Sequence, residues 1–118
     1  MTKDYTDLIV WQKAMNLVTE IYRLTRKLPK DELFGLTSQL RRAAVSIPSN
    51  IAEGQGRLTQ GEFRLFLGNA RGPLSELETQ ILIARNLDLI DKIEAARLLE
   101  MATEVGRTLN GLIASTKR

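Results

Sequence analysis

Apolar side chains recur every three or four residues along most of the chain, which is the spacing of one face of an α-helix. No stretch shows the sustained alternation of apolar and polar residues that is typical of a strand. The predicted helices cover residues 8–28, 36–54, 60–87 and 91–116. The third has the strongest signal, because its apolar stripe steps by four and three residues from Phe63 to Ala84.

Helix-breaking and capping residues mark where the predicted helices begin and end. Pro29 ends the first helix. Thr59 with Glu62, and Asp91 with Glu94, have the spacing of a capping box and begin the third and fourth helices. The connections are short, at about residues 29–35, 55–58 and 88–90. Short connections make consecutive helices antiparallel neighbours.

Two prolines fall inside predicted helices. Pro48 lies in the second helix, and the apolar stripe keeps its phase across it. This favours a kinked, continuous helix over a break that Asn50 and Glu53 would cap and restart. Pro73 predicts a bend in the third helix. Together these elements predict an all-α fold, a single up-down-up-down antiparallel four-helix bundle over residues 1–118.

The composition restricts the chemistry that the chain can perform. It contains no cysteine and no histidine, which excludes thiol nucleophiles, histidine-based triads and two-histidine zinc sites. Hydrophobic residues make up 43% and charged residues 26%, the balance of a globular protein. No apolar run is long enough for a signal peptide or a membrane span, so we expect a cytoplasmic protein with no membrane contact.

The glutamates offer the remaining route to a metal site or to catalysis. Glu53 lies in the second predicted helix and Glu62, Glu76 and Glu78 in the third, and carboxylates on facing helices can bind two metals, but the di-metal sites of such bundles also use Glu-x-x-His pairs. The serines beside Pro48 have no histidine to activate them. We therefore expect no metal, no cofactor and no enzymatic activity. A carboxylate- and metal-dependent hydrolase or nuclease is the least favoured alternative.

Positive charge is concentrated in the first half of the chain, and five arginines form the candidate binding surface. The net charge is +3, from 17 basic and 14 acidic residues. The five are Arg41, Arg42, Arg57, Arg64 and Arg71. Such a patch neutralises phosphates, whereas the alternative is a solvated face with ion pairs, such as Arg57 or Arg64 with Glu62. No aromatic residues alternate with these arginines, which counts against single-strand recognition.

Apolar residues beyond one stripe per helix suggest a further partner, most simply another copy of the chain. The first helix begins with four apolar residues at 8–11, and the third adds Leu65, Phe66 and Ile83 outside its stripe. A wide core-facing stripe explains the same pattern equally well. Structural or interface roles are assigned to Trp11, Pro48, Asn50, Glu53, Phe66 and Glu76.

The block QLRRAAVSIPSNIAEG at residues 39–54 is the most specific feature of the chain. With LIVWQKA at residues 8–14 and ARGPLSELE at residues 70–78, it resembles small bacterial four-helix bundle proteins encoded within intervening sequences of 23S ribosomal RNA genes. That family is similar to the accessory variability protein of diversity-generating retroelements. Pro73 is a departure, because the family commonly has serine at this position.

The resemblance implies a bundle that assembles as a homopentameric ring with a positively charged surface. It also implies a binding protein, with nucleic acid or a reverse transcriptase as partner. We therefore expect a non-enzymatic, oligomeric nucleic-acid-binding protein whose arginines contact RNA or DNA phosphates with little sequence specificity. The alternative is a protein–protein interaction or scaffold module, for example a reverse-transcriptase accessory subunit. Its binding would survive moderate salt and depend on apolar residues such as Trp11 or Phe66.

Overall fold

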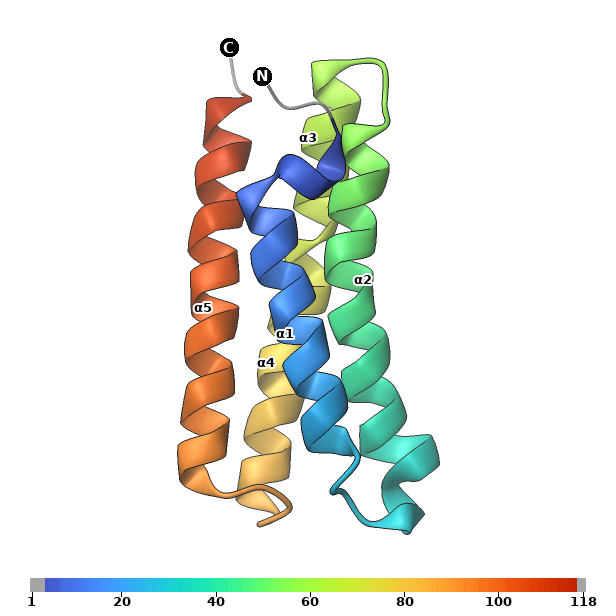
Figure 1. The fold of residues 1–118 in the computed structure, drawn as a ribbon, viewed down its shortest axis with the longest axis vertical. Helices are drawn as coiled ribbons and strands as arrows, with labels where there is room; N and C mark the ends of the chain where they lie inside the picture. The colour runs from blue at the N-terminus through green and yellow to red at the C-terminus, as the bar shows by residue number, and fades with distance from the viewer. Residues whose placement is uncertain (1–3, 117–118) are drawn as a thin grey trace.

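The computed structural model describes residues 4–116 of the chain, which form four antiparallel helical rods (Figure 1). The main helices are α1 (Ile9–Thr25), α2 (Ser38–Gln55), α3 (Gln60–Asn69), α4 (Arg71–Asn86) and α5 (Lys92–Ser115). α3 and α4 follow one another within one rod. No strand occurs in this range, so the predicted all-α, four-helix fold is confirmed. The predicted domain also includes residues 1–3 and 117–118, which lie outside the described range.

The apolar stripes of the rods meet in one core that runs along the bundle. α1 packs against α2 and α5, while α4 packs against the other sides of the same two helices. The fully buried side chains include Leu17, Leu40, Ile47, Leu77 and Leu98. Removing these side chains from water is the main contribution that holds the rods together. The result is an elongated body of 45 × 23 × 20 Å.

The rod predicted as one helix over residues 60–87 is interrupted. α3 ends at Asn69, and Ala70 separates it from α4. Pro73 accounts for the break, because it has no N–H to bond the carbonyl of Asn69 and its ring clashes with that carbonyl. The Ala70 N–H instead bonds the Leu67 carbonyl at 3.1 Å. The helix is therefore interrupted near Pro73, three residues before the proline.

α2, in contrast, continues through Pro48, as the phase of its stripe predicts. Pro48 is buried in the core. The Asn50 side chain donates to the Ser46 carbonyl at 2.8 Å, so it bonds its own helix and does not begin a new one. The predicted caps of the later helices are present, since Thr59 and Asp91 accept hydrogen bonds from the N–H groups three residues further on.

The connection between α1 and α2 is more ordered than its sequence suggests. It contains two short helices, η2 (Lys30–Glu32) and the π-helical turn η3 (Leu33–Thr37). The Glu32 carboxylate accepts the N–H of Leu36 at 3.3 Å, and Leu36 is buried. Phe34, within the same turn, is 93% exposed. The connection is therefore anchored to the core while it presents an aromatic ring to solvent.

Candidate nucleic-acid interface

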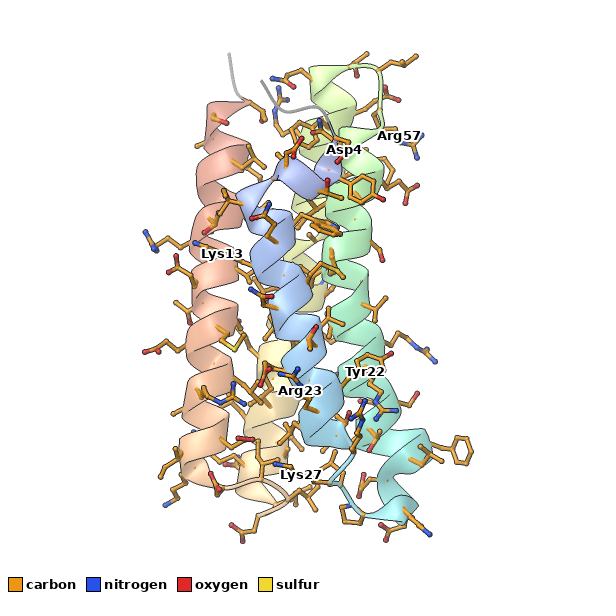
Figure 2. All side chains as sticks on the ribbon, in the orientation of Figure 1. Asp4, Lys13, Tyr22, Arg23, Lys27 and Arg57 are labelled. Carbon is orange, nitrogen blue, oxygen red and sulfur yellow. The ribbon has the colours of Figure 1, made fainter. Side chains whose placement is uncertain are left out.

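The five predicted arginines are spread over both ends of the bundle. Arg41 and Arg42 lie in the first turns of α2, and Arg57 follows the other end of the same helix, about 24 Å away along its axis. Figure 2 shows Arg57 near one end of the bundle and Tyr22, on which Arg41 packs, toward the other. The fold therefore does not gather the five arginines into one patch.

Arg57 and Arg64 are bound within the fold. The Arg57 guanidinium lies 4.4 Å from the centroid of the Phe66 ring and forms an ion pair of 2.8 Å with Glu53. Arg64, on α3, donates to the hydroxyl of Thr116 at 3.2 Å and to its carbonyl at 3.0 Å. Arg64 thereby caps the carboxyl end of α5, where cations are favoured by the helix dipole. Both guanidinium groups therefore help to hold parts of the fold together.

Arg71 is exposed at the start of α4 and lies in a surface of mixed charge. It lines a hollow between α4 and α5 together with Glu78 and Arg107. Arg107 is itself bound to Glu104 at 2.6 Å. The acidic and basic groups around Arg71 offset one another, so this hollow has no excess of positive charge.

Arg41 is held in a fixed orientation between α1 and α2. Its Nε donates to the hydroxyl of Thr25 at 2.8 Å, and its guanidinium lies 4.6 Å from the centroid of the Tyr22 ring. The buried Thr25 hydroxyl in turn donates to the Ile21 carbonyl at 2.8 Å. The two terminal nitrogens of Arg41 make no hydrogen bond with any described residue. They remain available to an anion.

Two adjoining hollows surround Arg41, with volumes of about 480 and 220 Å³. They share Leu33, Thr37 and Arg41, and we call the surface that they form the α1–α2 groove. Its cationic and aromatic residues are Tyr22, Arg26, Lys30, Phe34, Arg41 and Arg42. None of the described residues that line the two hollows is acidic.

The four cations of the groove take part in no ion pair with another residue of the range 4–116. Two carboxylates, those of Asp31 and Glu32, lie nearby on η2. One of them, Glu32, is turned toward the N–H of Leu36. Arg23, beside Tyr22 in sequence, pairs with Glu20 and does not line the groove. The groove is therefore a surface of unbalanced positive charge.

In space, aromatic side chains accompany Arg41 and Arg42, although none alternates with them in sequence. Tyr22 comes from α1 and Phe34 from η3, and both line the groove beside Arg41 and Arg42. They do not alternate with the arginines because the fold brings them from earlier parts of the chain. Sequence reasoning also missed Arg26 and Lys30. The sequence does contain one signal for Phe34, which is a bulky apolar residue in the charged connection between the first two helices.

The other residues predicted to have structural or interface roles lie in varied surroundings. Trp11 is half-buried against the core, with its ring 5.3 Å from that of Tyr5 in an edge-on arrangement. Phe66 is half-buried under Arg57, while Glu53 supplies the carboxylate of the same cluster. Glu76 is exposed on α4.

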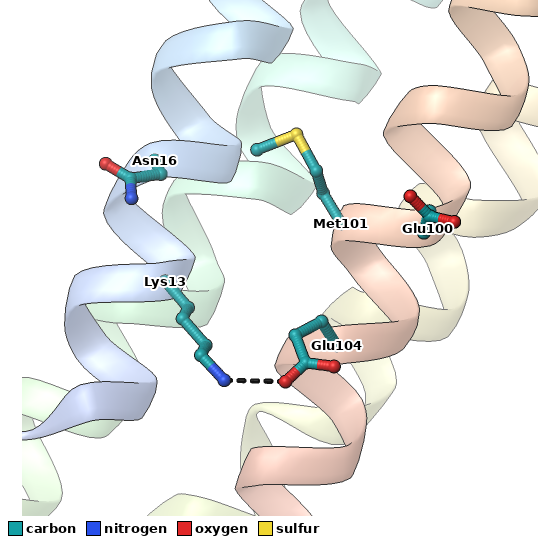
Figure 3. A pocket seen from close by; sticks show the side chains of 5 residues that line it. All are labelled: Lys13, Asn16, Glu100, Met101 and Glu104. Carbon is teal, nitrogen blue, oxygen red and sulfur yellow. Dashed lines mark hydrogen bonds and ion pairs between the residues drawn. The ribbon is translucent and has the colours of Figure 1, made fainter.

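A third hollow, of about 370 Å³ between α1 and α5, is lined by one lysine and two glutamates (Figure 3). Lys13 contacts Glu104 at 2.7 Å and the Thr108 hydroxyl at 3.0 Å. Hydrogen bonds from Arg107 and then Lys13 lower the pKa of Glu104 to about 2. Because its one cation is already paired and its lining carries two carboxylates, this hollow is a poor site for a phosphate.

Two further features bear on function classes. Across residues 4–116, no three acidic side chains lie close enough to share a metal ion. Within the same range, no helix has both the length and the apolar character of a membrane span.

Comparison with known proteins identifies relatives of the chain. A crystal structure of a protein of unknown function from the S23 ribosomal protein family of Bacteroides thetaiotaomicron has the same fold, with a TM-score of 0.83 and 22% sequence identity. The match covers 89% of this chain and 98% of that one. No curated protein matches the sequence. The family model described as 23S rRNA-intervening sequence protein matches residues 6–111, and the chain therefore belongs to this family.

Proposed function

We propose that the protein is a non-enzymatic nucleic-acid-binding protein and that the α1–α2 groove is its phosphate-binding surface. The observation that carries the proposal is the set of four unpaired cations in a groove with no acidic lining. Cations that neutralise phosphates release the counterions of the nucleic acid, which drives binding at low salt. None of these four cations has an ion-pair partner among the described residues.

Arg41 and Arg42 have complementary roles in this proposal. Thr25 and Tyr22 hold the Arg41 side chain, so little conformational entropy is lost when its terminal nitrogens bind a phosphate. Arg42 is exposed and reaches the backbone of a longer ligand. Contacts of this kind position a nucleic acid but do not read its bases. The expected binding is therefore tolerant of sequence and sensitive to salt.

Assembly into a homopentameric ring is a second part of the proposal. Apolar side chains outside the core support a contact between copies, since Ile9 is 57%, Leu65 61% and Ile83 43% exposed. A ring presents several grooves to one nucleic acid, and linked weak contacts strengthen binding. The mass of the purified protein in solution, measured by light scattering, tests this part, and the expected value is five times 13.3 kDa.

A charge reversal in the groove tests the phosphate-binding surface. The binding of a fluorescein-labelled RNA hairpin is followed by fluorescence anisotropy from about 50 to 200 mM salt. Arg42→Glu is expected to lower the affinity at least about tenfold at the lowest salt. Arg71→Glu is the matched control, because it changes the net charge equally outside the groove, and it is expected to lower the affinity less than about threefold.

The scaffold alternative predicts a different outcome from the same titrations. A protein that binds only another protein shows no RNA binding in low salt. RNA binding that is equally weakened by Arg42→Glu and Arg71→Glu would show that net charge alone attracts the RNA, and would contradict the assignment of the groove. Reverse transcriptase then becomes the partner to test.

A further inference from the structure

We propose that the α1–α2 groove recognises single-stranded nucleic acid and that an unpaired base stacks on Phe34. The inference rests on the proposed function and specifies its ligand. The groove combines an exposed aromatic ring with four cations that form no ion pair with a described residue. Aromatic platforms within positively charged grooves are how many proteins hold single strands.

Phe34 is presented to solvent by an anchored turn. Its side chain is 93% exposed, although burial of a phenylalanine is strongly favoured. The turn is anchored on the carboxyl side of Phe34, since Glu32 accepts the N–H of Leu36 and both Leu36 and Thr37 are buried. The backbone that carries the ring is anchored, so a stacked base orders only the side-chain torsions of Phe34.

The two aromatic residues of the groove differ in what covers them. One face of the Tyr22 ring is occupied by the Arg41 guanidinium at 4.6 Å. Tyr22 is also only 37% exposed, and its contact with Arg41 serves to orient that arginine. Phe34 has no ring or guanidinium partner among the described residues. Phe34 is therefore the ring that is open to a base.

A single strand uses this surface more fully than a duplex does. In a duplex the bases stack on one another and present only their edges, so the phosphates alone reach the groove. A single strand places its phosphates on Arg42, Arg26 and Lys30 and turns a base toward the ring. The larger hollow of about 480 Å³ lies within the size range of small-molecule sites. The groove is thus expected to prefer unpaired strands.

The charge of the groove favours a polyanion over a protein segment. Four cations line it, and no acidic group among the described lining residues offers a partner to a basic or neutral peptide. An acidic peptide with an aromatic side chain is the remaining competitor. Such a peptide would use its own ring on Phe34, and its binding is one outcome of the test below.

The test compares a labelled oligouridylate of about 12 nucleotides with an RNA duplex of the same length. Phe34→Ala is expected to weaken binding of the single strand about tenfold, the loss of one stacked base, and to change duplex binding less than twofold. Phe34→Tyr keeps the ring and should retain wild-type affinity. Phe34→Leu keeps an apolar side chain without a ring and should behave as Phe34→Ala does.

Leu58→Ala is the matched control, because Leu58 is 98% exposed in the turn at the opposite end of the bundle. This variant should bind both RNAs as the wild type does. Thermal unfolding of every variant checks that the fold is intact, which is expected because each side chain lies almost entirely in solvent.

The outcomes separate this inference from the proposed function. Equal affinity of the wild type for both RNAs, or full single-strand binding by Phe34→Leu, would overturn base stacking while phosphate binding in the groove stands. Binding of an acidic aromatic peptide in place of the single strand overturns it as well. Failure of the wild type to bind either RNA contradicts both proposals.

Discussion

The α2–α3 end of the bundle and the α1–α2 groove use the same residue type in opposite ways. At the α2–α3 end, Arg57 lies over Phe66 and Arg64 binds the last turn of α5. In the groove, Arg42 and Arg26 have no ionic partner among the described residues. In sequence, Arg42 is grouped with Arg57 and Arg64, and Arg26 is not singled out. Their partners show that the first pair holds the fold and the second is free to bind.

At the α2–α3 end, we expect the largest effect from a substitution at Gly54, where α2 meets α3. A Cβ at Gly54 would lie 2.8 Å from the Cβ of Phe66 and 3.2 Å from the Phe63 ring. We expect Gly54→Ala to lower the free energy of unfolding by about 2 kcal/mol, because the two helices must move apart. Urea denaturation measures the change.

Gly111→Ala is the control for this substitution. Gly111 is exposed in α5, and a Cβ there meets no atom within 4 Å. The variant should gain up to about 1 kcal/mol from the higher helix propensity of alanine. Opposite signs for the two variants support the close approach of α2 and α3. A Gly54→Ala protein as stable as Gly111→Ala would show that the helices are not packed at this distance.

Two arginine variants distinguish an arginine that holds the fold from one that is free to bind a ligand. Arg64→Ala removes the hydrogen bonds to Thr116 and should lower the free energy of unfolding by about 1 kcal/mol. Arg42→Ala should change it by less than about 0.5 kcal/mol, because Arg42 is an exposed surface residue. Denaturation midpoints provide the measurement. Equal destabilisation by both variants contradicts the distinction between the two regions.

The end of the bundle that carries the groove can be stabilised without touching its binding residues. Asp88, in the α4–α5 turn at that end (Figure 1), has a φ of 59°. The Leu89 N–H bonds the Ala84 carbonyl at 2.9 Å, in the arrangement that usually places glycine at this position.

Asp88→Gly should therefore raise the free energy of unfolding by about 0.5–1 kcal/mol, because glycine adopts this conformation without steric cost. Asp88→Asn is the comparison that removes only the charge, and it should give a smaller gain. RNA binding should stay at the wild-type level. A lower melting temperature for Asp88→Gly would contradict the geometry of the turn.

The smallest expected effect concerns pH and the paired charges of the α1–α5 hollow. The pKa of Glu104 is lowered from 4.5 to about 2 by hydrogen bonds from Arg107 and Lys13. Its contribution to stability is therefore fully present above about pH 4.5 and is lost as the pH falls toward 2. Melting temperatures of the wild type and Glu104→Gln should differ slightly at neutral pH and converge in acid. A difference that persists at pH 2 would contradict this assignment.

The sequence predicted the fold better than the site, for identifiable reasons. Apolar spacing reports which side of a helix is buried, so the four rods and the continuity of α2 through Pro48 follow from it. The break at Ala70 was displaced from Pro73 because a proline disturbs the turn before it. The groove brings Tyr22 of α1 beside Phe34, Arg41 and Arg42 of the following segment, and the local pattern of neither segment reports this combination.

The salt dependence of RNA affinity tests the central claim most directly. For the wild type, Arg42→Ala and Arg64→Ala, the logarithm of the association constant is plotted against the logarithm of the salt concentration. We expect Arg42→Ala to reduce the slope by about one unit, the loss of one phosphate contact, and Arg64→Ala to leave it unchanged. An unchanged slope for Arg42→Ala, with a reduced slope for Arg64→Ala, would contradict this expectation.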